Sequence, residues 1–278
     1  MKNPMQLKAK IKNISKETGI SAQLVLQNYM LERLLERISL SEYKHNFILK
    51  GGFLIASIVG LNTRATMDMD VTLKGLPLNE QLLLEMFEKI CKVKTDDPFD
   101  FEITKVSEIR EGDTYTGYKV SLIGKYSPMT VPIKLDVTTG DRITPKEISF
   151  SYEMLFDEGY LEVLAYNVET ILAEKLETII SRSDQNTRPR DFYDVYILSK
   201  LKWEYIDFKV LSKALNMTSS YRGTQSMMKD YISVINTIRN SKDMNEYWLR
   251  YQKDFDYAIG LTFEDVLDEA LKVLGQIL

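Results

Sequence analysis

The chain has 278 residues, of which 44% are hydrophobic and 27% are charged, a composition typical of globular proteins with one large or two ordinary domains. Its formal net charge of −4 excludes a global basic field for nucleic acid, so any such contact has to be local. One cysteine (Cys91) and one histidine (His45) exclude an internal disulfide, a typical structural zinc site, and Ser-His-Asp or Cys-His catalysis that does not use His45.

Residues 1–165 are predicted to form a mixed α/β domain that begins with N-terminal helices. A basic, capped lead-in over residues 1–20 is followed by a helix from the N-cap Ser21 to about Ile38, because leucine and isoleucine recur there at helical spacing. The next predicted elements are a strand at 47–49, a short apolar helix at 53–59, a strand at 67–73 and an amphipathic helix at 80–93.

The hydrophobic periodicity changes over residues 100–140 from helical spacing to the alternation of β-strands. The segments FEITKVSEI, YKVSLIGKY and MTVPIKLDV alternate or are rich in β-forming residues, with Gly112-Asp113 and Ser127-Pro128 between them. This pattern predicts an antiparallel meander. A last strand is predicted at 160–166.

Residues 166–278 are predicted to form a helical domain. A helix is expected over Val168–Arg182, and from about residue 190 the chain keeps leucine, isoleucine and tryptophan at helical spacing. Thr262 and Asp265 resemble a capping box for the last helix.

The most informative motif is Gly51-Gly52 followed by Asp68 and Asp70. Alternate side chains of a strand share one face, so the two aspartates are expected to point the same way, where like charges repel unless a cation lies between them. Paired glycines allow a backbone to approach a phosphate closely. The motif therefore predicts a site for a metal-bound nucleotide.

Asp136 is a candidate third carboxylate of that site. It shares a strand face with Lys134 and joins Asp68 and Asp70 if the two strands are neighbours. Three carboxylates would bind two divalent cations, or one cation plus the proton of an attacking hydroxyl. The alternative is that Asp136 only begins the turn over residues 138–141.

Lys175 is unusual because it projects into the middle of the apolar stripe of its predicted helix. A buried ammonium is costly unless an anion lies nearby, and a polyphosphate or an aspartate would supply one. The alternative is a long stem that reaches water at the edge of a groove.

Asp191 and Asp194 are i, i+3 neighbours on a partly apolar helix face that starts at Pro189. Helix capping explains one of them, and we expect the pair to line a cleft and to hold Lys175 or an arginine. Arg64 and Thr66 precede the aspartate pair and are candidate nucleotide-binding residues, with Arg64 either reaching a phosphate or lying in a solvated loop.

Together these motifs resemble the AbiEii/AbiGii toxin family, which lies within the DNA-polymerase-β-like nucleotidyltransferases. They occur in the order Gly51-Gly52, Arg64-x-Thr66-x-Asp68-x-Asp70, Lys134-x-Asp136, Glu174-Lys175-Leu176 and Arg190-Asp191-x-x-Asp194. The resemblance covers roughly residues 45–200, and no motif matches the helical tail. It implies an α+β fold with a nucleotidyltransferase-like mixed sheet, flanking helices and a C-terminal helical bundle.

The resemblance also implies an activity and its partners. A bacterial toxin of abortive phage infection, paired with a cognate antitoxin, would move a nucleotide from a nucleoside triphosphate to an acceptor, with RNA such as the tRNA 3′ end expected. Asp68 and Asp70 would bind Mg²⁺ or Mn²⁺, and Lys175 with Asp191 or Asp194 would be essential. Two other functions stay open: a non-catalytic RNA- or protein-binding module on this fold, and a nucleotidyltransferase that acts on an antibiotic.

The sequence also carries an expectation about location. The first twenty residues lack the apolar core of a signal peptide, and the apolar runs are shorter than a membrane span. We therefore expect a cytoplasmic protein with no membrane partner.

Overall fold

The computed structural model describes residues 3–109 and 117–278, and these residues divide into two compact units. The first unit comprises Met1–Asp141 and Ile148–Ala165, and the second comprises Arg142–Glu147 and Tyr166–Leu278. A short segment ahead of residue 165 thus groups with the helical part of the chain. The predicted turn at Gly112-Asp113 lies outside the described residues.

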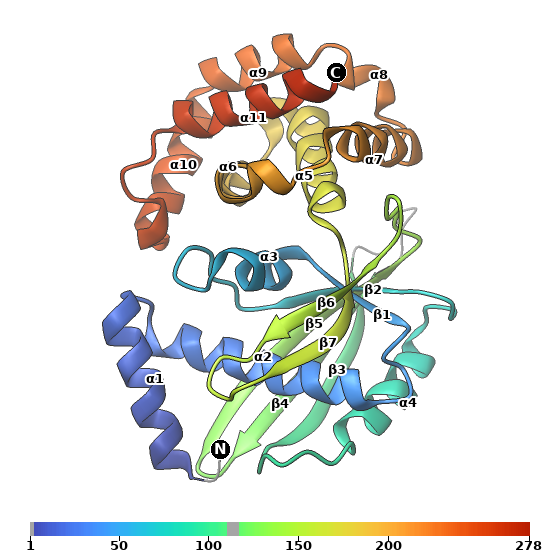
Figure 1. Ribbon diagram of the computed structural model, residues 1–278, viewed down its shortest axis with the longest axis vertical. Helices are drawn as coiled ribbons and strands as arrows, with labels where there is room; N and C mark the ends of the chain where they lie inside the picture. The colour runs from blue at the N-terminus through green and yellow to red at the C-terminus, as the bar shows by residue number, and fades with distance from the viewer. Residues whose placement is uncertain (1–2, 110–116) are drawn as a thin grey trace. The chain divides into compact units, whose positions relative to one another are not determined.

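The first unit is built on a seven-stranded mixed sheet with the strand order β3-β4-β5-β2-β1-β7-β6 (Figure 1). Strands β2 and β5 are parallel, as are β1 and β7, and the remaining neighbours are antiparallel. The strands are β1 (Phe47–Lys50), β2 (Met69–Leu73), β3 (Asp100–Ile109), β4 (Gly117–Tyr126), β5 (Met129–Thr139), β6 (Ile148–Glu153) and β7 (Tyr160–Ala165).

The helices described in this unit are α1 (Pro4–Thr18), α2 (Ala22–Leu40), α3 (Gly51–Val59) and α4 (Glu80–Cys91). The Ser21 hydroxyl accepts a hydrogen bond from the Leu24 amide and caps α2, as its position in the sequence predicts. Helix α2 contacts β5 and β7, α4 contacts β3, and α3 contacts β1 and β2 (Figure 1).

The two faces of the sheet differ in polarity because side chains alternate along each strand. In β5, Ile133, Leu135 and Val137 are buried on one face, while Lys134 and Asp136 lie on the other. The apolar face packs against α2 and α4, which buries the core of the unit. The opposite face carries the polar residues of the strands, and we call it the polar face.

The second unit is helical. Its helices are α5 (Val168–Arg182), α6 (Pro189–Lys202), α7 (Phe208–Tyr221), α8 (Gln225–Met228), α9 (Tyr231–Asn240), α10 (Lys242–Asp254) and α11 (Phe263–Ile277). Helix α5 packs against α6 and α7, and α11 packs against α6 and α9 (Figure 1). Thr262 and Asp265 form the predicted capping box of α11.

The predicted fold class is confirmed: a mixed sheet with flanking helices precedes a helical C-terminal region. The meander over residues 100–140 is β3-β4-β5, as its alternation predicts. Some details differ from the prediction. Helix α3 begins at Gly51 itself, β2 begins at Met69, and the edge strand β6 was not predicted.

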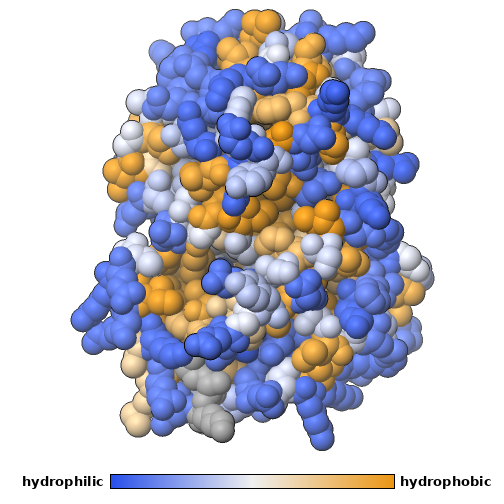
Figure 2. Space-filling view, in the orientation of Figure 1, coloured by the Kyte–Doolittle hydropathy of each residue, from blue (hydrophilic) through white to orange (hydrophobic). Residues whose placement is uncertain are grey.

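Hydrophilic residues cover much of the visible surface, and apolar residues gather in smaller patches (Figure 2). Large exposed apolar side chains include Met5, Tyr205 and Ile259. Among the helices of the described chain, none combines the length and the apolar character that a membrane span requires.

Candidate functional site

A row of four charged residues crosses the polar face of the sheet. Asp70 on β2 is in register with Asp136 on β5, Lys119 on β4 is opposite Asp136, and Lys50 on β1 is opposite Asp70. Residues in register on neighbouring strands project to the same face and lie close enough to interact. The sheet therefore brings Asp70 and Asp136 together, with a lysine at each end of the row.

Gly51 lies against Asp70 at the start of helix α3. Its φ of +66° is in the left-handed region, which favours glycine. A Cβ atom at this position would collide with the carboxylate of Asp70. Gly51 is thus required both for the backbone turn from β1 into α3 and for the close approach of the Asp70 side chain.

Gly52, Arg64 and Thr66 pack together beside this turn. A Cβ atom on Gly52 would lie 3.0 Å from Thr66 Oγ1 and 3.1 Å from Arg64 Nη2. Arg64 is buried and donates to the Ala65 carbonyl. The alternative prediction that Arg64 is a solvated loop residue is therefore wrong. Thr66 donates to Asp68 Oδ1 at 2.9 Å, and Asp68 lies one residue ahead of β2.

Asp136 has an unusual electrostatic environment. Burial raises the pKa of its carboxyl, Lys119 lowers it, and Asp70 and Asp68 raise it further, so the net pKa is raised. The Lys119 ammonium lies 3.3 Å from Asp136 Oδ1, and this buried oxygen accepts no hydrogen bond from the described residues. The carboxylate is therefore compensated in part, by one half-exposed lysine.

The donor chemistry of this site fits a hard divalent cation. Asp70 and Asp136 supply carboxylate oxygens side by side, and Asp136 Oδ1 retains hydrogen-bonding capacity. Within residues 3–109 and 117–278, no three acidic, histidine or cysteine side chains form a group that could hold a metal ion. Mg²⁺ is commonly bound by one or two carboxylates plus substrate phosphates, and a two-carboxylate set satisfies that pattern.

A second network on the polar face was not predicted from the sequence. The Lys50 ammonium donates to Thr138 Oγ1 and Asp141 Oδ2, both at 2.6 Å. Thr72 and Thr138 hydroxyls also donate to Asp141 Oδ2, each at 2.6 Å. Burial raises the pKa of Asp141, but Lys50 and the two hydroxyls outweigh it and lower the pKa to about 2. The position of Lys50 directly before Gly51 was the signal that could have identified this lysine as part of the site.

The remaining predicted residues form a cluster within the second unit. The Lys175 ammonium lies 2.6 Å from Asp191 Oδ1 and 2.9 Å from Asp194 Oδ2, and both carboxylates are almost fully buried. Burial lowers the pKa of Lys175, but the two aspartates outweigh it, so the net pKa is raised. The structure thus supplies the anion that the apolar surroundings of Lys175 require, and it does so with aspartate.

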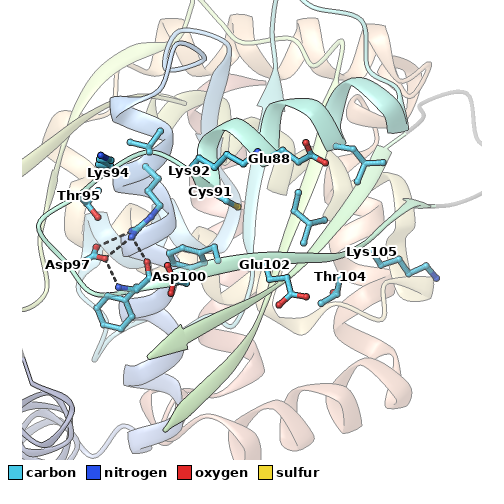
Figure 3. Close-up of a pocket in the computed structure, with 16 residues that line it drawn as sticks. Glu88, Cys91, Lys92, Lys94, Thr95, Asp97, Asp100, Glu102, Thr104 and Lys105 are labelled. Atoms are coloured by element: carbon cyan, nitrogen blue, oxygen red, sulfur yellow. Dashed lines mark hydrogen bonds and ion pairs between the residues drawn. The ribbon is translucent and has the colours of Figure 1, made fainter. Parts of the chain in front are cut away.

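His45 and Cys91 show no catalytic arrangement. His45 is exposed in the turn before β1, and burial raises the pKa of Cys91 to about 11, which keeps its thiol protonated at neutral pH. Cys91 lines a pocket of about 810 Å³ beside α4 and β3, together with Asp97 and Phe101 (Figure 3). None of the predicted site residues lines this pocket.

Comparison with solved structures supports the fold. A proposed nucleotidyltransferase from Helicobacter pylori is 13% identical, with a TM-score of 0.52 over 93% of this chain and 97% of that chain. JHP933, also from H. pylori, is 14% identical, with a TM-score of 0.52 over 93% and 94%. At this identity the likeness concerns the fold alone. Comparison with curated proteins gives no match.

A family model decides the relationship. The model described as "Nucleotidyl transferase AbiEii toxin, Type IV TA system" matches residues 33–269, which is well over half of the 278-residue chain. The match includes both the polar face with Asp70 and Asp136 and the helical unit with Lys175. The chain therefore belongs to the AbiEii family of nucleotidyl transferase toxins of type IV toxin–antitoxin systems.

Proposed function

We propose that this toxin transfers a nucleoside monophosphate from a nucleoside triphosphate to an RNA hydroxyl, with Asp70 and Asp136 at the reacting centre. The observation that carries the proposal is their register on the neighbouring strands β2 and β5. That register places two carboxylates side by side on the polar face, directly beside the glycine turn that opens α3.

The glycine turn would bind the triphosphate. The first amides of a helix have no partner within the helix and favour anions, and α3 begins at Gly51-Gly52, where neither residue has a side chain of its own and no side chain caps the helix. Thr66 would hold Asp68 in place, and Arg64 would support the turn from beneath, in contact distance of Gly52.

Asp70 and Asp136 would hold a divalent cation, with Mg²⁺ or Mn²⁺ expected from the oxygen ligands, and Asp68 would add a further negative charge close to Asp136. When bound, the cation would neutralise charge on the transferring phosphate and orient it. Asp136 would accept the proton of the acceptor hydroxyl. The oxygen of that hydroxyl would bond to the α-phosphorus, and pyrophosphate would leave. Most of the rate enhancement would come from positioning and electrostatics, which need no histidine.

The Lys175 cluster would be a second requirement for activity. Two buried carboxylates face one ammonium, so the three side chains carry a formal charge of −1. We propose that Asp191 and Asp194 fix the Lys175 ammonium in one position within the second unit, and that this arrangement is essential for activity.

The biological role would be growth arrest during phage infection. The family places the chain in a toxin–antitoxin system, so a cognate antitoxin is its natural partner. We propose tRNA as the acceptor, because an RNA 3′ end offers a free hydroxyl to the transferred phosphate, and modification of that end would block translation.

The test is incubation of the purified protein with each α-³²P-labelled nucleoside triphosphate, MgCl₂ and total RNA, followed by denaturing gel electrophoresis. We expect label in one RNA size class, and loss of that label with EDTA or with Asp70→Ala. Label in tRNA identifies the acceptor. A wild-type protein that labels no RNA with any nucleotide contradicts the proposal, and a parallel reaction with aminoglycosides tests small-molecule acceptors.

A further inference from the structure

The side chain of Lys50 extends across the strands that carry the site. Lys50 is the last residue of β1, and the order of neighbouring strands is β1-β2-β5. Its Nζ reaches Thr138 on β5, so the side chain has to pass over β2 on the polar face. Asp70 is the cross-strand partner of Lys50, and the Lys50 stem therefore begins beside Asp70.

Asp141 binds the far end of the Lys50 side chain. One carboxylate oxygen, Oδ2, accepts hydrogen bonds from Lys50, Thr72 and Thr138, each at 2.6 Å. The three donors come from β1, β2 and β5, so a single oxygen ties together the strands that bear Lys50, Asp70 and Asp136. The side chains of Lys50 and Asp141 are 12% and 19% exposed, so solvent screens the pair only in part.

The same network limits where Asp70 can point. Gly51 lies against the Asp70 carboxylate, and Lys50 immediately precedes Gly51 in the chain. Lys50 is extended, with φ −148° and ψ −170°, and its side chain is held at its far end. Asp141 thus holds the side chain of Lys50 beside Asp70. Through Lys50 it also restrains the backbone that leads into the glycine turn.

We propose that Asp141 and Lys50 are positioning residues of the nucleotidyl-transfer site: Asp141 holds Lys50 across β2, and Lys50 fixes the orientation of Asp70 and of the Gly51 turn. The assignment rests on the proposed function for its catalytic consequence, but the orientation of Asp70 is a property of the protein alone. Neither residue needs to touch the substrate.

The decisive variant is Asp141→Asn, which keeps the size of the side chain and removes the charge that holds Lys50. Asp97→Asn is the matched control, because Asp97 is another carboxylate of the first unit that is held in an ion pair, with Arg37 at 2.7 and 3.0 Å (Figure 3). Both variants lose an ion pair, and the hydrogen-bonding partners of Asp97 among the described residues, Arg37 and Phe99, are not predicted site residues. Asp141→Glu serves as the conservative variant.

Two readouts decide the matter. Crystal structures of wild type and Asp141→Asn give the Asp70 rotamer and the Lys50 position, without any need for activity. Kinetics of RNA labelling give kcat and the KM for the nucleotide. We expect a changed Asp70 orientation, a kcat lowered about tenfold or more with KM changed less than about threefold, and partial recovery in Asp141→Glu.

The outcomes are separable. An Asp70 side chain that keeps its orientation in Asp141→Asn overturns the proposal, as does a kcat equal to that of Asp97→Asn when both variants have lost similar thermal stability. A wild-type protein without transferase activity overturns the proposed function instead, and the Asp70 orientation in the two crystal structures then still decides the positioning role.

Discussion

Asp70 and Asp136 face each other in register across the parallel strands β2 and β5, although 66 positions separate them in the chain. Each lies on the polar face while its strand neighbours on the other face are buried. The electrostatic coupling is direct, since Asp70 raises the pKa of Asp136. The Lys119 ammonium, 3.3 Å from Asp136 Oδ1, offsets part of the repulsion between the two carboxylates.

Replacement of Asp70 by Ala should remove activity and leave the fold intact. Asp70 is half-buried on the polar face, so its loss opens no apolar cavity, whereas the reaction loses a charged ligand. We expect RNA labelling to fall by about 100-fold or more and the melting temperature to change by a few degrees at most. Growth after induction in cells gives a second readout, and a fully toxic Asp70→Ala variant contradicts the mechanism.

Gly51→Ala should damage both stability and activity. The left-handed backbone at φ +66° costs an alanine about 1–2 kcal/mol, and the added methyl collides with the Asp70 carboxylate. Gly19→Ala is the control, because Gly19 has φ +75° and no atom near its Cβ position. Urea unfolding should show a larger loss for Gly51→Ala than for Gly19→Ala. Equal losses would mean that the close approach of Asp70 to Gly51 does not exist in solution.

Lys175→Met should be strongly destabilising. The substitution leaves Asp191 and Asp194 buried without their ammonium, and breaking a buried ion pair in this way costs about 3–5 kcal/mol. The triple variant Lys175→Met/Asp191→Asn/Asp194→Asn removes all three charges and should recover part of that loss. Urea unfolding of the two variants and of wild type measures the difference. A triple variant less stable than Lys175→Met would show that the charges do not form one coupled cluster.

Glu32 should make the stability of the first unit depend on pH. Burial raises the pKa of its carboxyl from 4.5 to about 7, although Arg33 and the Leu155 amide lower it. A carboxyl with a raised folded-state pKa binds its proton more tightly in the folded protein, so stability falls as pH rises from about 4.5 through 7. The expected fall is about 3 kcal/mol, and it should be absent in Glu32→Gln. Parallel stability curves for the two proteins between pH 4.5 and 8 would contradict this assignment.

Local patterns in the sequence were sufficient to predict much of the fold. The caps at Ser21 and Thr262 are local hydrogen bonds, and the alternation in β4 and β5 reflects one buried and one polar face. Strand β6 was missed although its sequence alternates apolar Ile148, Phe150 and Tyr152 with Ser149, Ser151 and Glu153. It lies at the sheet edge, where most of its side chains are exposed. That alternation is the pattern of a strand with one solvated face, and it could have identified β6.

The residue types of the candidate site could be predicted from the sequence, but the contacts between residues far apart in the chain could not. Spacing alone indicated that Asp68 and Asp70 share a side, and the apolar stripe around Lys175 indicated that it needs an anion. The partner of Asp136, by contrast, depends on which strands become neighbours, and residues 138–141 were interpreted only as a turn. Asp141 gained its significance from donors 91 and 69 positions away, which no local pattern contains.

The second unit is discontinuous in sequence, and this has a consequence for synthesis of the chain. Thr144 belongs to it: its amide donates to Thr170 Oγ1, and its carbonyl accepts from the Asn167 side chain that caps α5. The segment Arg142–Glu147 leaves the ribosome before β6 and β7, yet its hydrogen-bonding partners follow them. No single cut in the chain can separate the units, and a fragment that starts at residue 166 begins its first helix without Thr144.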